Sequence, residues 1–117
     1  MATAKLIDLL GAYETLKVAY TGAVTKGDIS TAVHAGRVLV AMDTYAANIP
    51  GIYVYEGRIQ AAKAAVAIAA GDTAYWDTGA LVFTNVVSTN VKCGIFVESA
   101  LSGDAEAVLE LDNSVNL

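Results

Sequence analysis

One stretch in the middle of the chain constrains the fold more than any other, because it joins a tight turn to two candidate strands. Gly71-Asp72 suits a tight turn, since glycine reaches positive φ without steric cost and aspartate can bond its own backbone two residues on. Thr73–Asp77 and Leu81–Thr84 are rich in strand-forming residues and are separated by a second turn signal. We therefore predict a β-hairpin that places Tyr75 and the single tryptophan, Trp76, beside its turn.

The Gly-Asp turn recurs twice, as Gly27-Asp28 and as Gly103-Asp104, and each time small or apolar residues follow at alternating positions. A chain of 117 residues with 56% hydrophobic and 16% charged residues fits one domain with a modest core. Strands at regular spacing with turn signals between them predict a mainly β fold. We expect a small β-barrel or β-sandwich with tight Gly-Asp turns and an N-terminal arm.

Further strands are predicted on both sides of the hairpin. Thr15–Tyr20 alternates strictly, which is typical of a half-buried strand. Val38–Met42 is apolar on both faces, so we expect it to be covered on both sides. The remaining predicted strands are Ile29–Val33, Arg37–Met42, Ile52–Ile59, Val91–Glu98 and Ala105–Leu111.

Three local features qualify this pattern. Pro50-Gly51 predicts a turn. Gly57, inside a predicted strand, indicates a bulge or a close approach of other atoms to the backbone. The alanine-rich segment Gln60–Ala70 is ambiguous, since alanine favours helix but Val66 and Ile68 have strand spacing. A helix stays open there, but a loop with a short strand, or one helical turn, is preferred.

The sequence predicts three parts: an N-terminal arm at residues 1–12, a β-rich domain at 13–112 and a tail at 113–117. The arm carries four large aliphatic residues, which would be costly to leave in water; they are Leu6, Ile7, Leu9 and Leu10. Some of them have helical spacing, but the segment is short and Gly11 ends it. It is either a terminal helix or strand packed on its own domain, or an arm that docks, together with Tyr13, on another chain.

No motif in the sequence supports catalysis. Cys93 reads as a small buried hydrophobe and His34 as a turn residue, because neither stands in a recognisable nucleophile–base arrangement. The three aspartates that follow glycine suit turns better than a metal site, and we expect no metal and no cofactor. Tyr75 and Trp76 are better core or interface anchors than a platform for stacking sugars. We predict that the protein is not an enzyme.

Charge and hydropathy limit the partners. A net charge of −5 argues against a surface that neutralises phosphates, so we expect no nucleic-acid partner. No apolar run reaches the roughly 18 residues that span a bilayer, and the N-terminus does not resemble a signal peptide, so we expect no membrane partner. The high apolar fraction instead suggests surface that is buried between chains.

Several of these segments together resemble the capsid decoration, or cement, proteins of tailed phages. The resemblance depends mainly on the second half of the chain: Gly71-Asp72-x-x-Tyr75-Trp76-Asp77, Gly94-Ile95-x-Val97-Glu98-Ser99-Ala100 and Ser102-Gly103-Asp104-Ala105. Val24–Asp28 and Tyr55–Ile59 with Lys63 resemble the family's earlier half more loosely. The match covers about residues 13–112. The alanine-rich segment before Gly71 and the bulky Phe96-Val97 depart from it, and Met1–Gly11 has no counterpart.

The resemblance implies a non-catalytic virion protein, made in the host cytoplasm, that binds the outer surface of an icosahedral capsid and stabilises it. Its implied partners are the major capsid protein and copies of itself, as a homotrimer. The candidate interface residues are the arm aliphatics with Tyr13, Tyr75 and Trp76. Two alternatives stay open: another virion component, such as a tail or head fibre, and a displayed carbohydrate-binding module.

Overall fold

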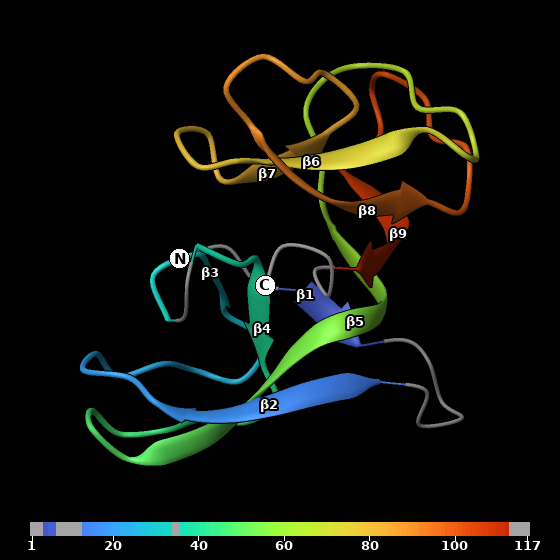
Figure 1. Ribbon diagram of the computed structural model, residues 1–117. Coiled ribbons are helices and arrows are strands. Elements are labelled where there is room, and N and C mark those ends of the chain that lie inside the picture. Colours follow the sequence, from blue (N-terminus) through green and yellow to red (C-terminus); the bar gives the residue numbers. More distant parts are fainter. Residues whose placement is uncertain (1–3, 7–12, 34–35, 113–117) are drawn as a thin grey trace.

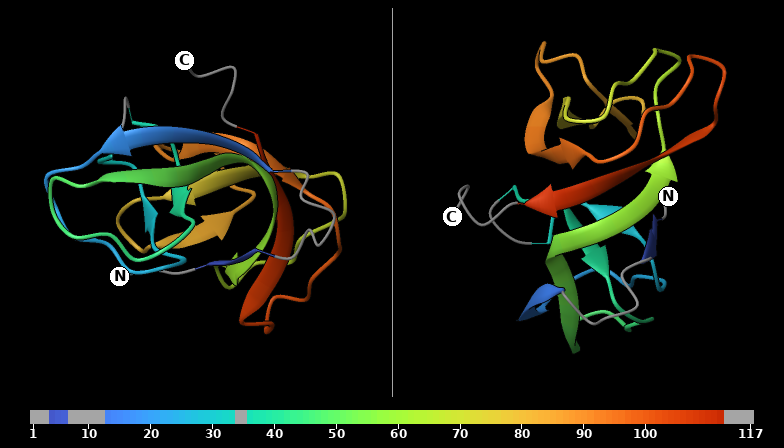
Figure 2. Two further views of the ribbon diagram at one scale, coloured as in Figure 1. Left: turned by 90° about the horizontal axis from the view of Figure 1, so that it is seen from below. Right: turned by 90° about the vertical axis from the view of Figure 1, so that its right-hand side faces the viewer.

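The computed structural model describes residues 4–6, 13–33 and 36–112, and this part of the chain is all β. It contains nine strands in one strongly curled sheet, with the order β3-β4-β5-β9-β8-β6-β7 and with β1 and β2 also paired to β5 (Figures 1 and 2). The mainly β prediction is confirmed. The strands are β1 (Ala4–Leu6), β2 (Glu14–Ala19), β3 (Ile29–Ser30), β4 (Leu39–Ala41), β5 (Pro50–Ala62), β6 (Thr73–Asp77), β7 (Val82–Thr84), β8 (Val91–Phe96) and β9 (Glu106–Asp112).

The long strand β5 joins the two halves of the molecule (Figure 1). The turn predicted at Pro50-Gly51 is wrong: these residues begin β5, where the missing proline N–H does no harm. The turn lies just before them, where the Ile49 N–H donates to the Ala46 carbonyl (3.3 Å) and Asn48 takes a φ of 65°. In the ambiguous segment β5 continues to Ala62 and residues 63–70 contain no helix, so of the two preferred alternatives the loop with a short strand is the one observed.

Gly57 lies in β5 with a φ of 148°, a conformation that favours glycine. A Cβ there would lie 2.1 Å from Cδ1 of Tyr13, so the tyrosine ring rests directly on the glycine backbone. The Tyr13 hydroxyl also donates to the Arg58 carbonyl, at 3.3 Å. The close approach predicted at Gly57 is therefore confirmed, and the neighbour is an aromatic ring of the same chain.

The three Gly-Asp turns share one hydrogen-bond pattern. In each, the aspartate Oδ2 accepts from the N–H three residues earlier, on Thr25 (2.8 Å), Ala69 (2.9 Å) and Leu101 (2.9 Å). The aspartate N–H donates back to the carbonyl of that same residue, at 2.9 to 3.0 Å. The sequence predicts that each aspartate bonds the backbone two residues ahead, and this prediction is wrong for the three Gly-Asp turns. Asp77 does form such a bond: its Oδ1 accepts from the Gly79 N–H (3.0 Å). Of the three glycines, Gly27 and Gly71 have positive φ and Gly103 does not.

The hydrogen-bond ladder repeats along the chain. Gly27 donates to the Ala41 carbonyl (2.8 Å), and Gly71 donates in the same way to the Phe96 carbonyl (2.8 Å). Three further contacts occur once in each half of the chain, and in each case the first-named lies in the earlier half. The mutual backbone bridge Val24–Tyr45 matches Ile68–Ala100, and the hydrogen bond Met42–Ile52 matches Val97–Val108. The strand register Ile29–Val40–Val54 matches Thr73–Ile95–Glu110. Residues 14–56, the first unit, and 57–112, the second unit, therefore have the same local architecture.

The repeat extends to the opening strand of each unit. In the first unit, Leu16 of β2 pairs with Tyr53. In the second unit, Ile59 of β5 pairs with Leu109, so Ile59 is the counterpart of Leu16 and Leu109 is the counterpart of Tyr53. The units differ in an insertion: Gly27 and Gly71 are 44 positions apart, whereas Ala41 and Phe96 are 55 apart. The extra residues of the second unit form the longer β6 and the hairpin strand β7.

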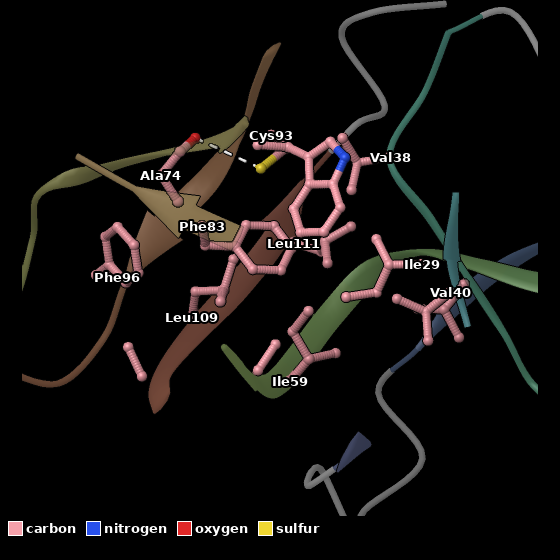
Figure 3. Close-up of a cluster of buried hydrophobic side chains, with 14 of the residues drawn as sticks. Ile29, Val38, Val40, Ile59, Ala74, Phe83, Cys93, Phe96, Leu109 and Leu111 are labelled. Atoms are coloured by element: carbon pink, nitrogen blue, oxygen red, sulfur yellow. Dashed lines mark hydrogen bonds between the residues drawn. The ribbon is translucent and has the colours of Figure 1, made fainter. Parts of the chain in front are cut away.

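Two buried clusters lie on opposite faces of β4. Leu39 and Ala41 belong to a cluster inside the first unit, together with Tyr53, while Val38 and Val40 belong to the main cluster. Figure 3 shows Ile29, Val38 and Val40 facing the side chains of the second unit. The prediction that Val38–Met42 is covered on both sides is confirmed for residues 38–41, which are fully buried.

Candidate interaction surfaces

The predicted hairpin forms, and it buries one of its two candidate aromatic anchors. Trp76 is 2% exposed and its ring packs 4.7 Å from that of Phe83, between centroids, across the β6–β7 pair. Tyr75, on the opposite face of β6, is half-buried. Since Trp76 is held in the core of its own chain, only Tyr75 is left at the surface, and the pair does not form a platform for stacking a sugar.

Cys93 is a buried structural residue. Its thiol donates to the Ala74 carbonyl at 3.5 Å (Figure 3), and burial raises the pKa of the thiol to about 12. Because the thiolate is the reactive form, a thiol with so high a pKa is a poor nucleophile at neutral pH. His34 lies outside the described residues. Within those residues no three histidine, cysteine, aspartate or glutamate side chains are placed to hold a metal ion.

One cation in the core has a structural task that the sequence did not reveal. Lys63 is 6% exposed, and its Nζ donates to the carbonyls of Ala64 (2.9 Å) and Val66 (2.9 Å) and, more weakly, of Ser102 (3.5 Å). The ammonium group thus ties the loop after β5 to the Gly103-Asp104 turn. A lysine in an alanine-rich segment gives no sign of this role, because its partners are main-chain carbonyls.

The N-terminal arm is described only in part. Ala4–Leu6 forms β1, which pairs antiparallel with Ile59–Ala61 of the same chain, and the Ala4 N–H donates to the Gly27 carbonyl (2.8 Å). The strand alternative for this segment therefore holds at residues 4–6. Ile7, Leu9 and Leu10 lie outside the described residues, as does the tail at 113–117. Tyr13 packs on Gly57, as described above.

Large apolar side chains are exposed mainly in the second unit. Three connecting segments carry four of them: the β6–β7 turn with Leu81, the β7–β8 loop with Val86 and Val87, and the β8–β9 loop with Leu101. Leu101 is 73% exposed, and its loop and the β7–β8 loop lie at the end of the molecule away from β2 (Figure 1). Ile95 on β8 and Ile49 before β5 are also exposed.

This curled sheet, with large apolar side chains exposed on its loops, suits a binding role. A family model described as phage cement protein matches residues 11–111. The chain belongs to the phage cement protein family. The cement family consists of phage structural proteins that stabilise the capsid, so the resemblance found in the sequence is confirmed. Comparison with curated proteins and with solved structures found no match.

Two features of this cement-family protein were not predicted from its sequence. It did not reveal the structural repeat, although Gly27-Asp28 and Gly71-Asp72 each follow a β-branched residue by the same distance. It also did not distinguish Tyr75 from Trp76, because strand alternation separates the faces without saying which one is covered. The described part of the chain contains no helix long and apolar enough to cross a membrane.

Proposed function

We propose that this protein binds the outer surface of an assembled icosahedral phage capsid, contacts the major capsid protein there and stabilises the shell. Family membership is the observation that carries the proposal. A protein that binds only the assembled lattice stabilises that state by mass action, and it needs no reactive group to do so.

The exposed loops of the second unit are the docking surface that we assign to the capsid. Isolated apolar side chains are common on protein surfaces, but Leu81, Val86, Val87 and Leu101 all project from one unit of a small protein. The loop of Leu101 is fixed at its base by the Asp104 carboxylate and by the Lys63 ammonium group. A rigid loop loses little conformational entropy when it binds.

The arm aliphatics Leu6, Ile7, Leu9 and Leu10 are a second proposed contact with another chain. Deleting residues 1–12 would also remove β1 and its pairing with β5, so it would confuse binding with folding. Replacing Leu9 and Leu10 by serine leaves the β1 residues in place. We expect this variant to melt like the parent chain in isolation but to occupy fewer sites on the capsid.

The decisive experiment mixes purified protein with capsids that lack it and sediments them at rising temperature. We expect the protein to co-sediment and to raise the temperature at which the shell breaks. Leu101→Glu should lower the occupancy at least tenfold without lowering the melting temperature of the free protein. If the protein stays in the supernatant at every concentration, capsid binding is refuted. If labelled protein marks one vertex or the tail instead of coating the head evenly, it is a different virion component.

A further inference from the structure

The structural repeat allows each surface of one unit to be compared with its counterpart in the other. In the second unit, the face formed by Ile59, Ala61 and Leu111 is fully buried. The corresponding residues of the first unit are Leu16, Val18 and Tyr55, and all three are only half-buried. Among the described residues, the same position in the repeat is therefore fully covered in one unit and only partly covered in the other.

The cover in the second unit comes from the first unit of the same chain. Ile29, Val40 and Val54, from three adjacent strands, belong to the main cluster with Ile59 and Leu111. Figure 3 labels all of these except Val54. They form what we call the outer face of the first unit. One unit thus packs its outer face on the inner face of the next.

The outer face of the second unit has no such cover among the described residues. Its members are Thr73, Ile95 and Glu110, which stand in the same register as Ile29, Val40 and Val54. Ile95 is 51% exposed, whereas Val40, its counterpart, is fully buried. An isoleucine in the middle of this open face is the residue that a second contact of the same kind would bury.

We propose that copies of this protein associate head-to-tail. The outer face of the second unit in one copy packs on the half-buried inner face of the first unit in the next. We call the accessible part of that inner face the tyrosine face; it consists of the half-buried residues Leu16, Val18, Tyr20, Tyr45 and Tyr55, which pack against the buried Tyr53. The contact repeats between copies the contact that the two units make within one. Because the two surfaces differ, the interface is heterologous, and it closes into a ring when the rotation between copies allows.

The two faces are chemically complementary. Tyr45 and Tyr53 lie 5.8 Å apart between ring centroids, and Tyr20 packs against the same buried cluster. Their bodies offer apolar area to Ile95, and tyrosine hydroxyls can donate to a carboxylate such as Glu110. On the outer face of the first unit, Val54 stands at the position that Glu110 occupies in the second unit. The proposed contact between copies is therefore more polar than the contact between the two units of one copy.

The proposal does not depend on capsid binding, and its test contains no capsids. The mass of the purified full-length chain is measured by light scattering over a range of concentrations, for the parent and for Ile95→Glu, Val18→Glu and Thr89→Glu. We expect the parent to exceed the 12.1 kDa of one chain, and the first two variants to be monomers. Thr89→Glu adds the same charge at an exposed residue of the β7–β8 loop, outside both faces, so it should match the parent. Melting curves of each variant check that the fold survives.

Mixing the two monomeric variants gives a sharper test. In a heterologous interface each variant keeps one working face, so an equal mixture of Ile95→Glu and Val18→Glu should form dimers and nothing larger. An interface that uses the same patch on both copies cannot be restored in this way. A parent chain that is monomeric at every concentration overturns the proposal. So does an Ile95→Glu variant with the parent's mass, or a mixture of two folded variants that stays monomeric.

Discussion

The packing of Tyr13 on Gly57 makes a quantitative prediction, because an added methyl group would meet a defined neighbour. The Cβ of an alanine at position 57 would lie 2.1 Å from Cδ1 and 2.8 Å from Cε1 of Tyr13. The backbone φ of 148° adds strain for any side chain, of order 1–3 kcal/mol. Displacing a packed ring costs about 1–3 kcal/mol more. We therefore expect Gly57→Ala to lower the free energy of unfolding by about 2–6 kcal/mol.

A second substitution separates the two costs. In a Tyr13→Ala background the ring is absent, so Gly57→Ala should cost only the backbone strain, about 1–3 kcal/mol. The coupling energy between the two positions is then about 1–3 kcal/mol, in the range measured for residues in contact. Urea unfolding followed by the fluorescence of Trp76, the single and buried tryptophan, gives all four free energies at one fixed protein concentration.

The double-mutant cycle also decides where Tyr13 lies. If the effects of Gly57→Ala and Tyr13→Ala add to within about 0.5 kcal/mol, the ring does not rest on Gly57 and the reasoning is refuted. That result would favour a contact of Tyr13 with another chain, as its place among the predicted interface residues suggests. A large coupling means that Tyr13 is committed to its own β5.

Three further predictions concern charged groups. Lys63→Met keeps the side-chain volume but leaves the carbonyls of Ala64 and Val66 without their donor, so urea unfolding should show a loss of about 2–3 kcal/mol; a loss below about 0.5 kcal/mol would contradict this role. Hydrogen bonds from the Asn85 side chain and the Ala69 N–H lower the pKa of Asp72, so its stabilisation is present at neutral pH and is lost as the pH falls through that lowered value. Asp72→Asn should therefore destabilise the protein at pH 7 but not in strong acid, as thermal melts across pH will show; a difference that persists in strong acid argues against the ionised carboxylate. Partial burial and the facing carboxylate of Asp112 raise the pKa of Glu56, so the ionised form is penalised in the fold and stability rises as the pH falls through the raised value. Glu56→Gln should raise the melting temperature at pH 7 and have less effect below the ordinary pKa of a glutamate; a lower melting temperature at pH 7 would contradict the repulsion.

The candidate surface was only partly predictable. Strand alternation in Thr73–Asp77 separates Tyr75 from Trp76, but it does not say which face a second layer will cover. The Phe83 ring that covers Trp76 comes from the returning strand, and its position depends on the hairpin register. The loop residues Leu81 and Leu101 became candidates only when the structure showed that nothing in their own unit covers them.

The sequence by itself determined most of the strands, the Gly-Asp turns and the family. Gly-Asp pairs, alternation and β-branched residues act through bonds and contacts within a few positions, so they can be read locally. The repeat could not be read in this way. The two units share a hydrogen-bond ladder rather than side chains, and the insertion that adds β7 moves their positions out of step. Only the tertiary structure decided which face is covered, because Val40 and Ile95 are similar residues in equivalent strands, and their burial depends on whether another unit packs against them.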